Sequence, residues 1–142
     1  MKENLNALDE LNKGATMGMD AINVVIKYVK DEKFKNELIE EYANYEAVSD
    51  KVKSIYKKHS SKKPHETNMM SKMMLSCGVM MNTMKDKSNS KIAEILIEGT
   101  TMGIVEGRKM LNNKEIDKEI NKLISAFVKV QEQHVETLKR YL

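Results

Sequence analysis

The side chains best suited to chemistry gather in one methionine-rich stretch, residues 68–84. This stretch holds seven of the twelve methionines and the single cysteine, Cys77. Along one face of a helix it would carry Met69, Met73, Cys77, Met80 and Met84. Thioether and thiolate sulfurs are soft ligands that suit Cu(I), but methionine is also an adaptable filler of cores and binding surfaces. We expect a short crossover helix whose methionines fill core or meet a partner, with a copper site as the alternative.

Few other residues have the surroundings that catalysis requires. Lys72 is the one nearby charge that would activate the Cys77 thiol as a nucleophile. The sequence has no Cys-x-x-Cys pair, no glycine-rich phosphate loop and no nucleophile elbow. His134 falls among the apolar positions of the last helical segment, where a histidine is more often a hydrogen-bonded core residue than a site residue. We therefore expect no catalytic residue, and the sequence favours a protein that is not an enzyme.

Length and composition indicate one domain outside the membrane. The 142 residues are 41% hydrophobic and 32% charged, with a net charge of +3, and a globular chain of this size buries about 68–70% of its unfolded surface. A single cysteine allows no intrachain disulfide, and no apolar run approaches the ~18 residues of a membrane span. We expect a cytoplasmic protein without a signal peptide and without a membrane or nucleic-acid partner. The lysines between residues 51 and 63 indicate a solvated helix end rather than a nucleic-acid or membrane patch.

Hydrophobic periodicity predicts an all-α fold. Proline occurs only at Pro64, and apolar residues recur at steps of three and four, as on one face of a helix. The expected helices span about residues 4–29, 32–58, 68–84, 91–111 and 115–141. The inward stripe of the helix over 32–58 leaves a choice between Tyr42 and Glu41. In the helix over 91–111, either Glu106 or Gly107 faces inward.

A short sequence occurs twice, as LNKGATMGM at 11–19 and as LIEGTTMGI at 96–104. With one neighbour, the two copies contain five of the six glycines: Gly14, Gly18, Gly99, Gly103 and Gly107. A glycine inside a helix costs roughly 0.5–1 kcal/mol relative to alanine, so a packing benefit has to offset it. We expect these glycines to let the first and third long helices approach each other closely, or to form a face that dimerises.

The repeat extends to the helices that follow each copy. The two copies lie 85 positions apart, and an offset near 82 lays Phe34 and Leu38 over Ile116 and Ile120. The chain therefore has the pattern of a duplicated helical hairpin whose two halves are related by an approximate twofold axis.

Three segments carry a resemblance to a known family: GATMGMDAI at 14–22, KIAEILIEGTTMGIVEG at 91–107 and QEQHVETLKRYL at 131–142. With the order of the helices, they resemble the ferritin-like superfamily, and within it an uncharacterised group of small bacterial bundle proteins related to the ferritin and rubrerythrin type. The resemblance covers nearly the whole chain. It implies an up-down four-helix bundle with one long crossover, here carrying the short extra helix, between the second and third long helices.

Ferritin-like enzymes hold two metal ions with a carboxylate from each of two helices and a Glu-x-x-His pair from each of the other two. This chain has His134, but Gln131 stands where the glutamate would be. The aligned positions of the second long helix are Ser49 and Val52, neither of which is a plausible ligand.

The resemblance leaves Glu41, Glu106 and His134 as candidate ligands for iron or manganese, with Tyr45 nearby. A di-iron centre uses about six ligands, so we expect a degenerate metal site and no bound cofactor. Our main expectation is a non-catalytic bundle that acts as a homodimer or by binding another protein, through its glycine- and methionine-lined faces. The alternative is a metal-binding or redox protein with an atypical iron or manganese site.

Overall fold

The computed structural model describes residues 2–60, 64 and 81–142. Its four long helices are α1 (Lys2–Val25), α2 (Glu32–His59), α4 (Asn89–Leu111) and α5 (Lys118–Lys139), and a 3-10 turn, η1 (Ile26–Tyr28), closes α1. Residues 81–83 are helical and form the described end of the crossover between α2 and α4. The expected all-α class with four long helices is confirmed. Cys77 and the methionines from Met69 to Met80 lie outside the described residues, so the copper alternative is not addressed.

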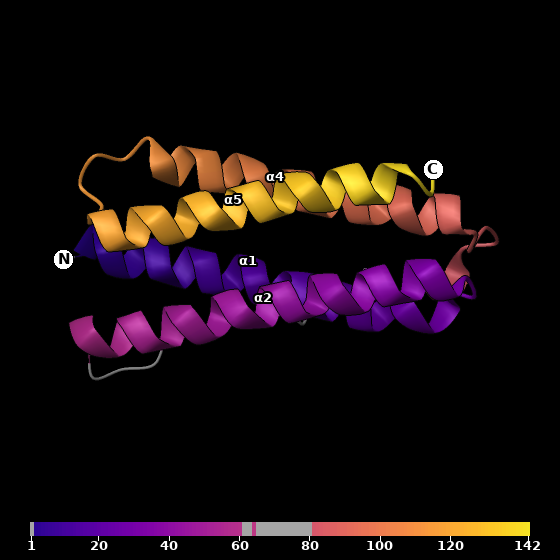
Figure 1. The fold of residues 1–142 in the computed structure, drawn as a ribbon, viewed down its shortest axis with the longest axis horizontal. Coiled ribbons are helices and arrows are strands. Elements are labelled where there is room, and N and C mark those ends of the chain that lie inside the picture. Colours follow the sequence, from indigo (N-terminus) through magenta and orange to yellow (C-terminus); the bar gives the residue numbers. More distant parts are fainter. Residues whose placement is uncertain (1, 61–63, 65–80) are drawn as a thin grey trace.

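The helices form two hairpins that pack together as a bundle. α1 packs mainly against α2, and α4 mainly against α5. Figure 1 shows the α4–α5 hairpin lying along the α1–α2 hairpin, with the end of α2 and the start of α4 at opposite ends of the bundle. The connection between α2 and α4 is therefore a long crossover, while those within the hairpins are short.

Side-chain caps fix where the helices begin. Asp31 precedes α2 and its carboxylate accepts a hydrogen bond of 2.8 Å from the amide of Phe34. Ser88 precedes α4 and its hydroxyl accepts from the amide of Lys91 at 3.3 Å. α5 begins at Lys118, later than the sequence indicates. The amide of Asp117, the residue before it, donates to Oδ1 of Asn4 at 2.9 Å. That bond ties the start of α5 to the start of α1.

The apolar stripes predicted from the sequence form the core. The most deeply buried large side chains described come from all four long helices and the crossover: Leu8, Leu11, Ile22, Val25, Phe34, Leu38, Val52, Met81, Ile92, Ile120, Ile124 and Leu138. Among the described residues, seven polar ones are buried with them: Asn4, Asn12, Glu41, Ser49, Thr100, Gln131 and His134. Buried polar groups are costly unless they are hydrogen-bonded, so their partners define the candidate site. None of the helices within the described ranges is both long enough and apolar enough to span a membrane.

Candidate functional site

A cluster of polar side chains lies where α2 meets α5, in the middle of the bundle. We call the buried residues Glu41, Tyr45, Gln131 and His134, together with the half-buried Asn44, the buried polar cluster. The Tyr45 hydroxyl donates to Oε1 of Gln131 at 3.0 Å. The amide of Asn44 donates to Nε2 of His134 at 3.2 Å, which places the proton of a neutral His134 ring on Nδ1. These two bonds join the α1–α2 hairpin to the α4–α5 hairpin.

Aromatic contacts fix the ring of Tyr45. The Phe127 ring meets it edge-on with centroids 6.1 Å apart, and the His134 ring does so at 5.3 Å. Such edge-to-face pairs contribute about 0.5–1.5 kcal/mol beyond the area they bury. Tyr45 is therefore held in one place, and its hydroxyl is aimed at Gln131.

The repeated glycines make room for this cluster. A Cβ at Gly18 would lie 2.6 Å from the Tyr45 ring, and a Cβ at Gly103 would overlap the amide of Gln131. Gly18 and Gly103 are equivalent positions of the two repeat copies. Each copy therefore admits one of the two side chains that hydrogen-bond to each other.

The expectation that the glycines bring α1 and α4 together needs correction. The atoms nearest to a Cβ at Gly14 belong to Phe127, and those nearest to a Cβ at Gly107 belong to Val128. Together with Tyr45 and Gln131, these are side chains of α2 and α5. A Cβ at four of the five glycines would meet side chains of α2 or α5, not the backbone of the other glycine-bearing helix.

Burial controls the charge of the two ionisable groups of the cluster. Glu41 is 4% exposed, and its pKa is raised from 4.5 to about 8 by burial first and then by the carboxylates of Glu37 and Glu40. The pKa of His134 is lowered from 6.5 to about 4 by burial. Both groups are therefore mainly neutral near pH 7, and they do not form an ion pair.

Tyr45 stays protonated as well. Its pKa is raised by burial first and then by Glu41, and the Thr100 hydroxyl acts weakly in the opposite direction. Two buried atoms, Oε1 of Glu41 and Nδ1 of His134, have no hydrogen-bond partner among the described residues. An unsatisfied buried group costs about 1–3 kcal/mol, so the cluster specifies how the hairpins pack at some expense of stability.

The described residues do not assemble the metal-ligand set that the resemblance implies. Glu41 and His134 both lie near Tyr45, but Glu106 is exposed on α4 and pairs with Lys109 at 3.4 Å. Within the described parts of the chain, no three histidine, cysteine, aspartate or glutamate side chains are placed to hold one ion. Oε1 of Gln131 already accepts the bond from Tyr45. This donor set does not fit an iron or manganese ion.

A second buried pair escaped sequence reasoning. The Ser49 hydroxyl donates to Oδ1 of Asn12 at 2.7 Å, joining α2 to α1. The repeat offset that aligns Tyr45 with Phe127 also aligns Ser49 with Gln131, so the two hairpins each bury one polar side chain at the same level. That alignment is the sequence signal for Ser49, whereas Asn12 has no such signal, because the 85-residue offset places it over Ile97.

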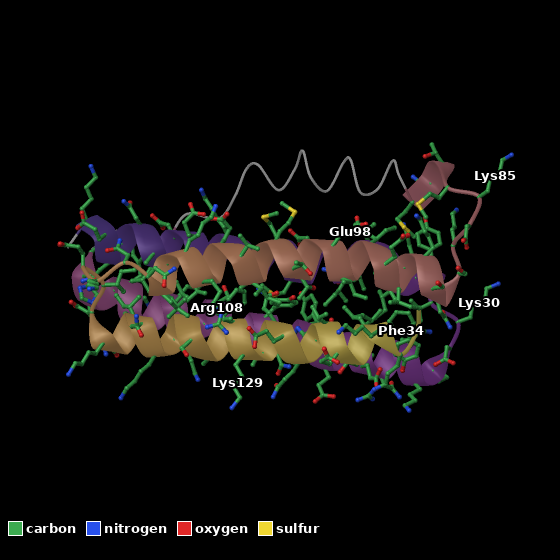
Figure 2. The ribbon with its side chains drawn as sticks, turned by 90° about the horizontal axis from the view of Figure 1, so that it is seen from above. Lys30, Phe34, Lys85, Glu98, Arg108 and Lys129 are labelled. Carbon is green, nitrogen blue, oxygen red and sulfur yellow. The ribbon has the colours of Figure 1, made fainter. Side chains whose placement is uncertain are left out.

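The outer face of α4 is the other unusual feature. Glu98, Met102, Val105 and Lys109 follow one another at spacings of four, three and four, and all are exposed. We call these four residues the α4 outer stripe. Met102 is 60% exposed and Val105 46%. In Figure 2, Glu98 lies on the side of α4 away from α5, whereas Arg108 lies between the two helices, where it pairs with Glu132 at 2.8 Å.

Gly99 adjoins the α4 outer stripe and differs from the other repeat glycines. A Cβ built there meets no atom within 4 Å among the described residues. The packing benefit that offsets the cost of a helical glycine at Gly18 and Gly103 is therefore missing at Gly99 in this part of the fold.

Comparisons with models of protein families, with curated proteins and with solved structures found no match. What the structure itself establishes is an all-α bundle of two packed hairpins joined by a long crossover.

Proposed function

We propose that this protein is a non-catalytic, ferritin-like helical bundle that acts by associating with protein through the outer face of α4. The observation that carries the proposal is the pair Met102 and Val105, two large apolar side chains exposed on one face of one helix. Single exposed apolar residues are ordinary, but a contiguous apolar surface marks an interaction site. The other large apolar side chains exposed in the described chain, Ile39 and Leu142, stand on other elements.

Gly99 supports the same face. An alanine at this position would stabilise an isolated helix by roughly 0.5–1 kcal/mol, and nothing in the described fold excludes its methyl group. A partner that approaches α4 closely beside Met102 supplies the packing benefit that the described residues do not.

The buried polar cluster supports a structural role rather than a catalytic one. Tyr45, Gln131 and His134 are at most 5% exposed, and their groups are neutral near pH 7. A general acid or base has to reach its substrate and change charge near the working pH. Glu41, with a pKa of about 8, would change charge near that pH, but at 4% exposed it does not reach a substrate. These side chains instead connect the two hairpins, which keeps the outer face of α4 in a fixed place.

The experiment that tests this function compares two glutamate substitutions. Met102→Glu places a charge in the centre of the α4 outer stripe, and Ile39→Glu makes the same change at a similarly exposed position, 53%, on α2. Size-exclusion chromatography with light scattering is run at high protein concentration. We expect Met102→Glu to reduce the mass of the associated species to that of the monomer and Ile39→Glu to leave it unchanged. Equal behaviour of both variants and the wild type would contradict the proposal.

A further inference from the structure

The α4 outer stripe is symmetric about its midpoint, between residues 103 and 104. Its ends carry opposite charges, Glu98 toward the start of the helix and Lys109 toward the end, and its centre is the apolar pair Met102 and Val105. At 3.6 residues per turn these four positions fall within about 60° of one another around the helix axis. They therefore form one narrow face with a charge, two apolar residues and the opposite charge along its length.

Such a face complements a second copy of itself when the two helices run in opposite directions. Glu98 of each copy then lies opposite Lys109 of the other, and Met102 lies opposite Val105. When the helices run in the same direction, Glu98 meets Glu98 and Lys109 meets Lys109, and like charges in contact are destabilising. The charge pattern therefore discriminates between the two orientations.

We propose that the partner of α4 is a second copy of this chain, bound about a twofold axis with the two α4 helices antiparallel. The inference rests on the proposed function and specifies its partner and geometry. A twofold contact is self-complementary: when one residue of the first copy contacts a given residue of the second, the same pair also meets with the two copies exchanged. A Cβ built at Gly99 meets no described side chain or neighbouring helix within 4 Å, so this position leaves the flank of the stripe open for the approach of the second helix.

The existing ion pair of Lys109 does not block this contact. Lys109 pairs with Glu106 at 3.4 Å, with side chains 70% and 62% exposed. Pairs this exposed contribute little to stability, so the Lys109 ammonium turns to Glu98 of the second copy at small cost. With two apolar residues on each side, the contact is small, and small interfaces are typical of weak association. We expect a dimer that forms at high micromolar concentration.

Charge reversal tests the geometry. In the antiparallel dimer, Glu98→Lys turns two symmetry-related attractions into two repulsions, and Lys109→Glu does the same. The double variant Glu98→Lys/Lys109→Glu restores both attractions with the signs exchanged. We expect each single variant to raise the dissociation constant at least about tenfold, and the double variant to return it to within about threefold of the wild type. Sedimentation equilibrium over a concentration series measures the constants.

Lys139→Glu is the matched control, because Lys139 on α5 pairs with Glu136 three residues before it, at 2.8 Å, as Lys109 does with Glu106. It is expected to leave the dissociation constant unchanged. If the chain dimerises and both single variants dimerise as well as the wild type, the antiparallel geometry is wrong while the proposed association stands. If the chain dimerises and Met102→Glu does not weaken the dimer, the dimer does not form through the α4 outer stripe.

A cysteine cross-link distinguishes a second copy of the chain from the chain's own Cys77 segment as the occupant of the α4 outer stripe. Val105→Cys is expected to give a disulfide-linked dimer on mild oxidation when Cys77 is replaced by serine, since the two copies of position 105 lie about one helical turn apart across the axis. A monomeric product in that background, together with an intrachain disulfide to Cys77 when Cys77 is kept, would show that the chain covers its own α4 face and would overturn the proposal.

Discussion

The hydroxyl of Tyr45 donates to Oε1 of Gln131 at 3.0 Å, and each of these two side chains lies over a glycine of one repeat copy. Gly18 of α1 receives the Tyr45 ring, and Gly103 of α4 receives the Gln131 amide. The two side chains of this hydrogen bond between α2 and α5 thus pack against equivalent glycines of α1 and α4. These four residues come from all four long helices. Their packing explains why glycine stands at the same position of both repeat copies.

The hydrogen bond can be removed without removing the ring. Tyr45→Phe keeps the contacts with Phe127 and His134 but leaves Oε1 of Gln131 buried without its donor. We expect a loss of about 1–3 kcal/mol in the free energy of unfolding, measured by urea denaturation. Tyr42→Phe, on the half-buried neighbour of the same helix, is the control and should change little. Equal effects of both substitutions would show that the bond does not hold the hairpins.

The two kinds of repeat glycine should respond in opposite directions to alanine. A methyl group at Gly18 meets the Tyr45 ring, so Gly18→Ala should destabilise by about 1–3 kcal/mol. A methyl group at Gly99 meets nothing in the described fold, so Gly99→Ala should stabilise the monomer by roughly 0.5–1 kcal/mol. Thermal unfolding at low protein concentration, where the monomer dominates, separates the two. A destabilising Gly99→Ala would contradict the open position at that residue.

Glu41 should make the fold less stable as the pH rises. Its pKa is 4.5 ordinarily and about 8 in the fold, because of burial and of Glu37 and Glu40. A raised folded-state pKa means that the folded chain holds a proton that the unfolded chain releases, so stability present below pH 4.5 is lost as the pH rises toward 8.

Glu41→Gln tests this dependence by removing the titration. Between about pH 6.5 and 8 the wild type should lose about 1–2 kcal/mol, and Glu41→Gln should stay nearly constant. Urea denaturation at a series of pH values measures both. Parallel curves for the two proteins would contradict a buried, protonated Glu41.

His134 should act in the opposite direction at lower pH. Its pKa is 6.5 ordinarily and about 4 in the fold, so its contribution to stability is present above pH 6.5 and is lost as the pH falls through 4. Between about pH 4.5 and 6.5 the Glu41 and His134 effects oppose each other, so the wild type should show little net slope. Glu41→Gln should reveal the loss on acidification, and adding His134→Gln should remove it. A wild type that already loses stability as steeply as Glu41→Gln would contradict this balance.

Helical periodicity was sufficient to predict the fold class and most of the core, because a buried stripe repeats every three to four residues whatever its partner is. At the edge of a stripe, however, neighbouring residues point only about 100° apart, and the sequence left two choices open. The structure buries Glu41 and leaves Tyr42 half-buried, and it buries Gly107 and leaves Glu106 exposed. Glu106 was therefore unable to join Glu41 and His134.

The partners of the glycines were beyond sequence reasoning for a related reason. A small residue indicates close approach by something, but its type carries no information about which helix supplies the approaching group. The packing of Tyr45 over Gly18 depends on how α1 and α2 are rotated about their own axes, which the bond from Tyr45 to Gln131 helps to fix. Gly99 is the repeat equivalent of Gly14, but a Cβ at Gly14 would meet the Phe127 ring at 3.4 Å, whereas a Cβ at Gly99 would meet no described atom within 4 Å.

The measurement that tests the central claim most directly is the mass of the wild-type protein by sedimentation equilibrium, from low to high micromolar concentration. We predict a weight-average mass that rises from the 16.3 kDa of one chain toward twice that value, and a Met102→Glu variant that stays at the monomer mass. A wild type that remains at 16.3 kDa at every concentration would contradict self-association through α4.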